Sequence, residues 1–157
     1  MSDIATITNN KKLSEPKEIL YFLCNQIKYI IDAINSDLAL GLTIEADTYI
    51  KINMFLDKLT SIADTDIGFL YYDSTTNIIT IKFAYLLKGK EYAIDILCNI
   101  YLEDTVNILN NLLSLSTYPA TIYDDILVLY NAYNKLSECV HQINKLITIN
   151  LNEDCDD

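Results

Sequence analysis

The chain has no tryptophan, and among its 157 residues only three are glycine and two are proline. Few turns can be built on these residues, so most of the chain is expected to be helix or strand. Three glycines are too few for a phosphate-cradling loop, and no G-x-S-x-G nucleophile elbow is present. With 51% hydrophobic residues, the length predicts one domain with a sizeable core.

Arginine is also absent, since all 11 basic residues are lysines. The chain therefore lacks the planar guanidinium that grips a phosphate or carboxylate at two points. A net charge of −11 repels nucleic acid and anionic membrane, so neither is expected as a partner. The acid is concentrated after residue 100, where nine acidic residues and two lysines give a net charge of −7. Such a chain can bind a basic protein partner or imitate DNA.

The four cysteines, Cys24, Cys98, Cys139 and Cys155, form no C-x-x-C pair and show no regular spacing. Neither a zinc site nor a redox motif is indicated. We expect buried free thiols in a reducing compartment. The chain also has no apolar leader and no run of about 18 apolar residues, which predicts a cytoplasmic protein.

The strongest pattern lies in residues 119–149, where apolar residues recur at alternating spacings of four and three. This heptad seam predicts one long amphipathic helix, with Thr117 as N-cap and Pro119 in its first turn. A competing interpretation folds residues 121–130 into a hairpin that turns at Asp124 and Asp125. The seam consists of Ile122, Ile126, Leu129, Tyr133, Leu136, Val140, Ile143 and Ile147.

The rest of the chain predicts an α+β fold. Helices are expected from Ser14 to about Gly41 and from Thr43 to about Ala63. A period of two then predicts a three-stranded antiparallel meander: residues 67–72, 78–87 and 91–101, with turns at 73–77 and 88–90. A short helix at 103–116 precedes the long amphipathic C-terminal helix. In a rival interpretation, residues 91–116 form one helix.

Three segments are expected along the chain. Residues 1–13 are polar and weakly patterned, which predicts a flexible arm. Residues 14–150 form the single α+β domain. Residues 151–157 are mostly acidic and are expected to be a disordered tail.

Reactive side chains are scarce. His141, the only histidine, is expected on the solvent side of the last helix. Asp64, Asp66 and Asp73 resemble a calcium loop superficially, but Gly68 comes one position early and a threonine replaces the bidentate glutamate. We therefore expect no catalytic residue, no cofactor and no metal, and a protein that is not an enzyme.

Tyrosine is abundant, with 12 residues, and it is enriched at protein interfaces because its large ring carries a polar tip. Tyrosines gather in and before the long helix, whose seam could also pair with a second copy as a homodimer. The candidate partner-binding residues are Tyr118, Tyr123, Tyr130, Tyr133, Leu136, Val140, Ile143 and Ile147.

Together these features predict a small acidic intracellular protein-binding factor: an inhibitor, adaptor or immunity-type protein that acts through an apolar, Tyr-rich surface. Small size, acidity and the helix–meander–helix order resemble type III secretion chaperones at the level of architecture. This resemblance implies an alternative, a secretion-type chaperone that binds a partner chain. The acidic C-terminal third permits another alternative, a DNA-mimicking inhibitor of a nucleic-acid enzyme.

Overall fold

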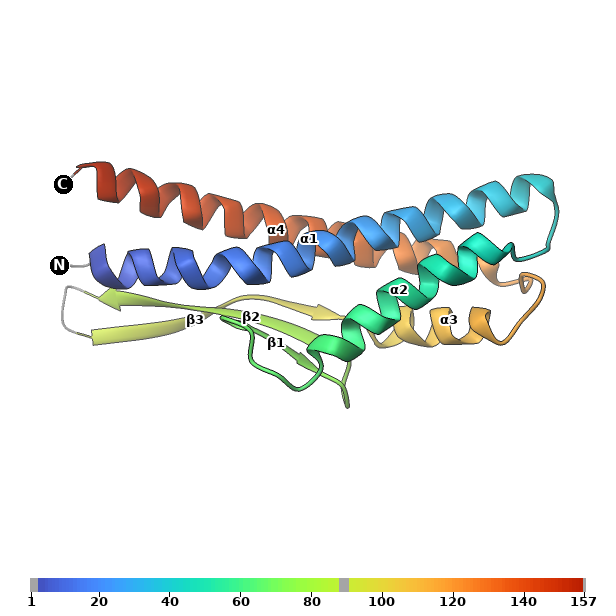
Figure 1. Cartoon of the computed structure of the whole chain (residues 1–157), viewed down its shortest axis with the longest axis horizontal. Helices are drawn as coiled ribbons and strands as arrows, with labels where there is room; N and C mark the ends of the chain where they lie inside the picture. Colours follow the sequence, from blue (N-terminus) through green and yellow to red (C-terminus); the bar gives the residue numbers. More distant parts are fainter. Residues whose placement is uncertain (1–2, 88–90, 157) are drawn as a thin grey trace.

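The computed structural model describes the backbone of residues 3–87 and 91–156, and the side chains of 15–82 and 98–145. Within these ranges four helices and a three-stranded antiparallel sheet are present, which confirms the predicted α+β layout (Figure 1). The elements follow in the order α1 (Asp3–Leu40), α2 (Ala46–Ile62), β1 (Leu70–Asp73), β2 (Ile78–Leu87), β3 (Glu91–Tyr101), α3 (Glu103–Leu113) and α4 (Ile122–Asp156).

Helices α1 and α4 run antiparallel along the length of the molecule, so that α1 begins and α4 ends at the same end (Figure 1). Both predicted apolar stripes face this contact and the sheet. On α1, Leu20, Leu23, Ile27, Ile30 and Ile34 are fully buried. The α4 seam is buried at Ile122, Ile126, Leu129, Leu136, Val140 and Ile143, and half-buried at Tyr133.

The two shorter helices cover the other half of the α1–α4 pair. Helix α2 packs on α1 through Ile52, Phe55, Leu59 and Ile62, all of which are buried. Helix α3 contacts both α2 and α4, and its buried residues include Leu109 and Leu112.

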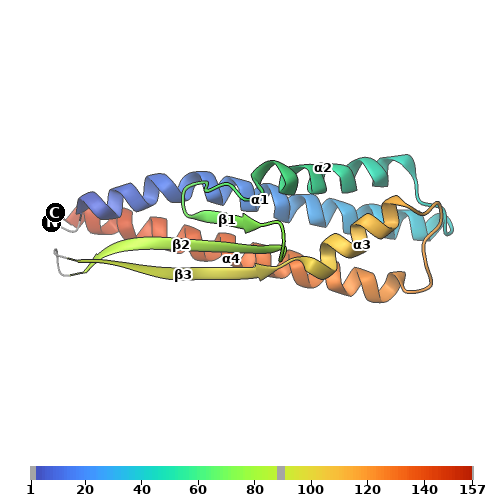
Figure 2. The ribbon, with the colours of Figure 1, turned by 90° about the horizontal axis from the view of Figure 1, so that it is seen from below.

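The sheet has the order β1-β2-β3 and lies against α1 and α4 through one face only. Seen from below, the strands lie in front of these two helices and no helix covers them (Figure 2). Along β2, Ile79 and Ile81 are buried while Lys82 is exposed, which is the alternation expected of a sheet with one wet face. The inner face also contains Leu70, Tyr72 and Ile100.

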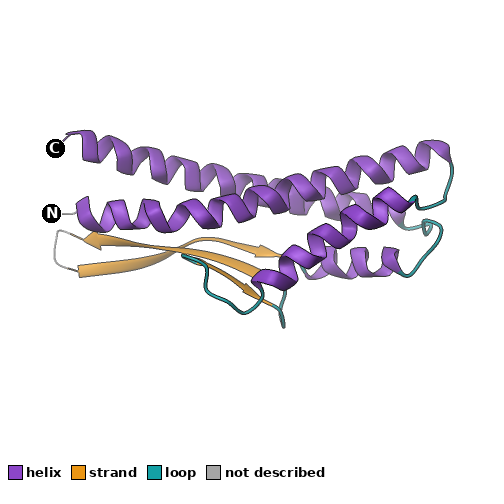
Figure 3. Ribbon diagram, in the orientation of Figure 1, coloured by secondary structure: helices purple, strands orange, loops and turns teal. Residues whose placement is uncertain are grey.

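Residues 91–101 are a strand and not the start of a helix, as the secondary-structure colouring makes plain (Figure 3). The pairing of β2 with β3 passes from Ile81–Cys98 to Lys82–Ile96. Leu97 is therefore the extra residue of a β-bulge, which the alternating pattern did not reveal. The turn predicted at 88–90 lies outside the described residues.

Several boundaries differ from the sequence predictions. Helix α1 begins at Asp3 and passes through Pro16, so helix occupies the segment expected to be a flexible arm. Helix α4 begins at Ile122 and extends to Asp156, so helix also covers most of the expected tail. Amphipathic periodicity shows which part of a helix packs against the core. The ends of a helix depend on local capping residues, whose signal in the sequence is weaker. The hairpin considered at 121–130 is absent, because this segment belongs to α4.

Two cysteines are joined, contrary to the expectation of free thiols. Cys98 on β3 and Cys139 on α4 form a disulfide of 2.08 Å, with their Cα atoms 6.4 Å apart. Sequence spacing misses such a pair because the packing of β3 on α4 brings together residues 41 positions apart. Cys24 is buried and free, as expected. The side chain of Cys155 lies outside the described residues.

Among the described residues, none of the helices combines the length and the apolar character needed to cross a bilayer.

Candidate binding surface on the open face of the sheet

The face of the sheet that points away from the helices carries a mixed set of side chains. We define the open face as Tyr71 on β1, Thr80 and Lys82 on β2, and Asn99 and Tyr101 on β3. Tyr71 is 38% exposed and Tyr101 is 62% exposed. These residues alternate with the buried residues of the same strands, so the pleat of the sheet places them outward.

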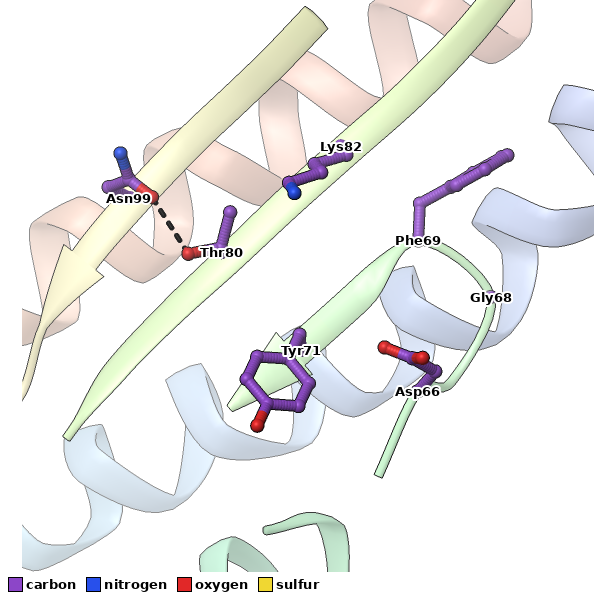
Figure 4. Close-up of a pocket in the computed structure, with 7 residues that line it drawn as sticks. All are labelled: Asp66, Gly68, Phe69, Tyr71, Thr80, Lys82 and Asn99. Atoms are coloured by element: carbon purple, nitrogen blue, oxygen red, sulfur yellow. Dashed lines mark hydrogen bonds between the residues drawn. The ribbon is translucent and has the colours of Figure 1, made fainter. Parts of the chain in front are cut away.

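A hollow of about 620 Å³ lies on this face, between β2 and the segment that leads into β1 (Figure 4). Thr80 and Asn99 stand side by side in it, and the Thr80 hydroxyl donates a hydrogen bond of 2.9 Å to Oδ1 of Asn99. This bond leaves the NH₂ group of Asn99 as a donor for a ligand. The lining residues are Asp66, Gly68, Phe69, Tyr71, Thr80, Lys82 and Asn99.

The wall of the hollow formed by residues 66–69 is held by backbone hydrogen bonds. Ile67 and Leu70 exchange two bonds of 3.0 Å, and the Lys82 amide donates to the Phe69 carbonyl at 2.9 Å. Gly68 sits in the turn between them at φ 61°, a left-handed conformation that glycine adopts without a steric penalty. A tight turn rather than a helical or strand pattern therefore places Asp66 and Phe69 beside the sheet.

Asp64 fastens this segment to the turn between β1 and β2. It accepts hydrogen bonds from the Ser74 amide at 3.1 Å and the Ser74 hydroxyl at 2.5 Å, and from the Tyr71 hydroxyl at 3.5 Å. The bonds from Ser74 favour the charged carboxylate and lower the pKa of Asp64 below its usual value. Asp73 caps the same turn by accepting from the amides of Thr75 and Thr76. These carboxylates are therefore occupied in turn structure, and no cluster suited to a metal occurs in the described part of the chain.

The described residues of the hollow offer aromatic carbon, a hydroxyl–amide pair, an ammonium and a carboxylate. Tyr71 and Phe69 supply apolar area, Thr80 and Asn99 supply neutral hydrogen-bonding groups, and Lys82 and Asp66 supply opposite charges. A polypeptide presents complementary groups to each of these, namely apolar side chains, backbone amides and carbonyls, and charges of either sign. The arrangement is suited to recognising an exposed segment of another protein.

The residues predicted from sequence to bind a partner do not line this hollow. Tyr118, Leu136, Val140 and Ile143 are buried, and α1 and the sheet cover the seam within the chain. In this structure these four side chains are consequently not accessible to a partner.

The other four predicted residues are placed differently. Tyr130 and Tyr133 are half-buried, and the Lys28 ammonium lies 5.5 Å from the centre of the Tyr130 ring. Tyr123 is 68% exposed on the outer side of α4. Ile147 lies outside the described side chains. His141 is exposed, as expected.

The alternating pattern identified the strands, but the outward side chains of the strands were not among the predicted partner-binding residues. The signal was available in part, because Thr80 and Lys82 alternate with Ile79 and Ile81 in the sequence. The contribution of Asp66 and Phe69 was not available, since it depends on how the segment before β1 folds back beside the sheet.

Comparison with known proteins finds no match for this chain, whether among protein-family models, curated proteins or solved structures.

Proposed function

We propose that this protein is a small binding factor that recognises a segment of another protein through the open face of its sheet. The observation that carries the proposal is the hollow of about 620 Å³ flanked by Tyr71 on a sheet face that no helix covers (Figures 2 and 4). Clefts of this size with apolar walls and a few placed polar groups are where proteins bind ligands.

The chemistry of the open face supports a peptide-like ligand. Exposed tyrosines supply large contact area at low entropic cost, and they are frequent among the residues that dominate binding energy. Tyr71 and Tyr101 lie on this face on the two outer strands. Among the described residues of the lining Lys82 is the only basic one, so a carboxylate of the ligand could pair with its ammonium.

The net charge of −11 favours a partner with basic character. Long-range attraction would steer such a partner toward the molecule, while the neutral and aromatic groups of the hollow would supply the close contacts. An inhibitor, adaptor or immunity-type role fits this description, and a cytoplasmic location is part of the proposal.

Site-specific photocrosslinking tests the surface directly. A photoreactive phenylalanine derivative is placed at position 71 on the open face, and in a matched chain at position 123, an exposed tyrosine on α4. Each chain is expressed in its source cell, irradiated, and analysed by mass spectrometry. We expect one specific adduct from position 71 and none of the same partner from position 123.

The opposite pattern, with an adduct from position 123 alone, would contradict the proposal and favour the surface of α4. Tyr71→Ala and Lys82→Glu should each lower the adduct yield from a probe at position 101, while Tyr123→Ala should leave it unchanged. If the crosslinking is repeated in cell extract, loss of the adduct between low and moderate salt would indicate the DNA-mimicking alternative, because exposed charge contacts are screened over about 10 Å at 0.1 M salt. An adduct with a chain bound in its unfolded form would indicate the chaperone alternative, and one with a second copy a homodimer.

A further inference from the structure

The disulfide joins the sheet to the helical layer beside the open face. Cys98 lies on β3 and pairs with Ile81, while Cys139 lies on α4. The residue after Cys98 is Asn99, whose side chain accepts the hydrogen bond from Thr80 in the hollow. One bond on the inner side of β3 therefore holds the strand whose outer side forms part of the candidate binding surface.

The disulfide is also accessible to a reagent. It borders a hollow of about 310 Å³ that is lined by Cys98, Cys139, Asn99, Lys135, Glu138 and Gln142. Cys139 is almost fully buried, whereas Cys98 is partly exposed. A thiolate entering this hollow would therefore reach the sulfur of Cys98 first.

The pairing of β3 with β2 is interrupted at the same place. The β-bulge at Leu97 interrupts the register directly before Cys98. Without the link to Cys139, this part of β3 would depend on the interrupted pairing with β2 and on noncovalent packing against α4. The position of Asn99 in the open face would then be less strictly defined.

We propose that Cys98 and Cys139 form a thiol–disulfide exchange site that takes a small thiol or a protein dithiol, and that its reduction releases β3 from α4. A thiolate of the reductant attacks Sγ of Cys98 and forms a mixed disulfide. The Cys98–Cys139 bond breaks, and its electron pair leaves on Sγ of Cys139, which takes up a proton. A second thiol resolves the mixed disulfide and frees Cys98, so the reductant is oxidised by two electrons.

The test uses the full chain with Cys155→Ser, so that Cys155 cannot exchange with the pair. Intact mass after thiol alkylation first counts the free thiols before and after treatment, in one arm with glutathione and in the other with a thioredoxin-type dithiol protein. Hydrogen–deuterium exchange then follows the backbone of β3 and, as an internal reference, the buried middle of α1. We expect about tenfold faster exchange in β3 after reduction and no change in α1.

A Cys98→Ser/Cys139→Ser chain should show the fast exchange without any reductant, and a Cys24→Ser chain should behave as the parent does. The arm that reduces the pair at the lower thiol concentration identifies the natural class of reductant. Two free thiols at Cys98 and Cys139 after air oxidation would overturn the proposal. Unchanged exchange in β3 after confirmed reduction would overturn it as well.

A consequence for binding rests on the proposed function. Reduction should lower the crosslinking yield from position 71 by about 5- to 150-fold, the usual range for two coupled sites. If no partner is captured in either redox state, the proposed function fails while the exchange data still decide the redox site. If a partner is captured equally in both states, the link between the two sites is overturned.

Discussion

The hydroxyl of Tyr118 donates a hydrogen bond of 2.5 Å to Oδ2 of Asp37, across 81 residues of sequence. The same oxygen accepts from the Thr48 hydroxyl at 2.6 Å and from the Glu45 amide at 3.3 Å. Asp37, Thr48 and Tyr118 are all buried. This carboxylate therefore ties the last turns of α1 to the start of α2 and to the loop before α4.

Replacing Tyr118 by phenylalanine removes the hydroxyl that donates to Asp37 and keeps the aromatic ring. A hydrogen bond to a charged group contributes about 1.5–3 kcal/mol. We expect Tyr118→Phe to lower the free energy of unfolding by about this amount, as measured by urea denaturation. Tyr123→Phe serves as the control because that side chain is 68% exposed, and its effect should stay within about 0.5 kcal/mol. Equal effects of the two changes would contradict the role assigned to Tyr118.

The same residue predicts how stability depends on alkaline pH. Burial, and then the hydrogen bond to Asp37, raise the pKa of Tyr118 above its usual value of 10.0. The folded state therefore holds its proton where the unfolded state loses it. This contribution is complete below about pH 10 and declines as pH rises above it, by up to about 1.4 kcal/mol per pH unit. We expect the difference in free energy of unfolding between wild type and Tyr118→Phe to narrow from pH 9 to pH 11.5. A constant difference would contradict a raised pKa of Tyr118 in the folded state.

Leu136 tests whether the α4 seam belongs to the core of one chain. It is fully buried, so Leu136→Ala should lower the free energy of unfolding by about 2–5 kcal/mol through lost contacts and a cavity. Leu127, on the same helix and 67% exposed, provides the matched control. Thermal denaturation of each variant should give a midpoint that does not change with protein concentration. A midpoint that rises with concentration would show that the seam is shared between chains.

Gly41 ends α1 at φ 148°, a conformation that residues with a side chain rarely adopt, and its amide donates to the Asp37 carbonyl at 3.1 Å. A Cβ at this position would meet no atom within 4 Å, so a substitution changes backbone strain and not packing. We expect Gly41→Ala to destabilise the fold by about 1–3 kcal/mol in urea denaturation. Ser36→Ala, at an exposed position in the same helix, should have little effect. If Gly41→Ala left the free energy of unfolding unchanged, the backbone at this position would relax without strain, contrary to the prediction.

Ser74 lowers the pKa of Asp64, near the hollow, through two hydrogen bonds to its carboxylate. Because its two hydrogen bonds lower the pKa of Asp64, Ser74→Ala should raise that pKa toward the usual value of 3.8. Asp64 stabilises the fold at pH values above that usual pKa, and this contribution declines as pH falls through its lower folded pKa. Carbon-detected NMR titration of the carboxylates measures the shift directly. Ser114→Ala, far from Asp64 in the sequence, should leave the Asp64 titration unchanged.

Periodicity predicted the elements well and their ends less well. The buried positions of α1 and α4 followed from spacing, because a stripe at helical period has to face the core. The start of α1 at Asp3 and the bulge at Leu97 did not follow, since both depend on competition between local backbone preferences of similar energy. The strand predicted at residues 91–101 is confirmed, and its antiparallel pairing with β2 excludes the rival helix.

The sequence by itself determined the α+β class, the apolar faces of the two long helices, and a composition that supplies one histidine and no arginine. Those properties depend on composition and on the spacing of nearby residues, so they can be read directly from the sequence. Only the tertiary structure decided that α1 covers the α4 seam, that Cys98 meets Cys139, and that Asp66, Tyr71 and Lys82 surround one hollow. Each of these depends on which distant segments pack together, and that packing is determined by the cooperative burial of the whole core.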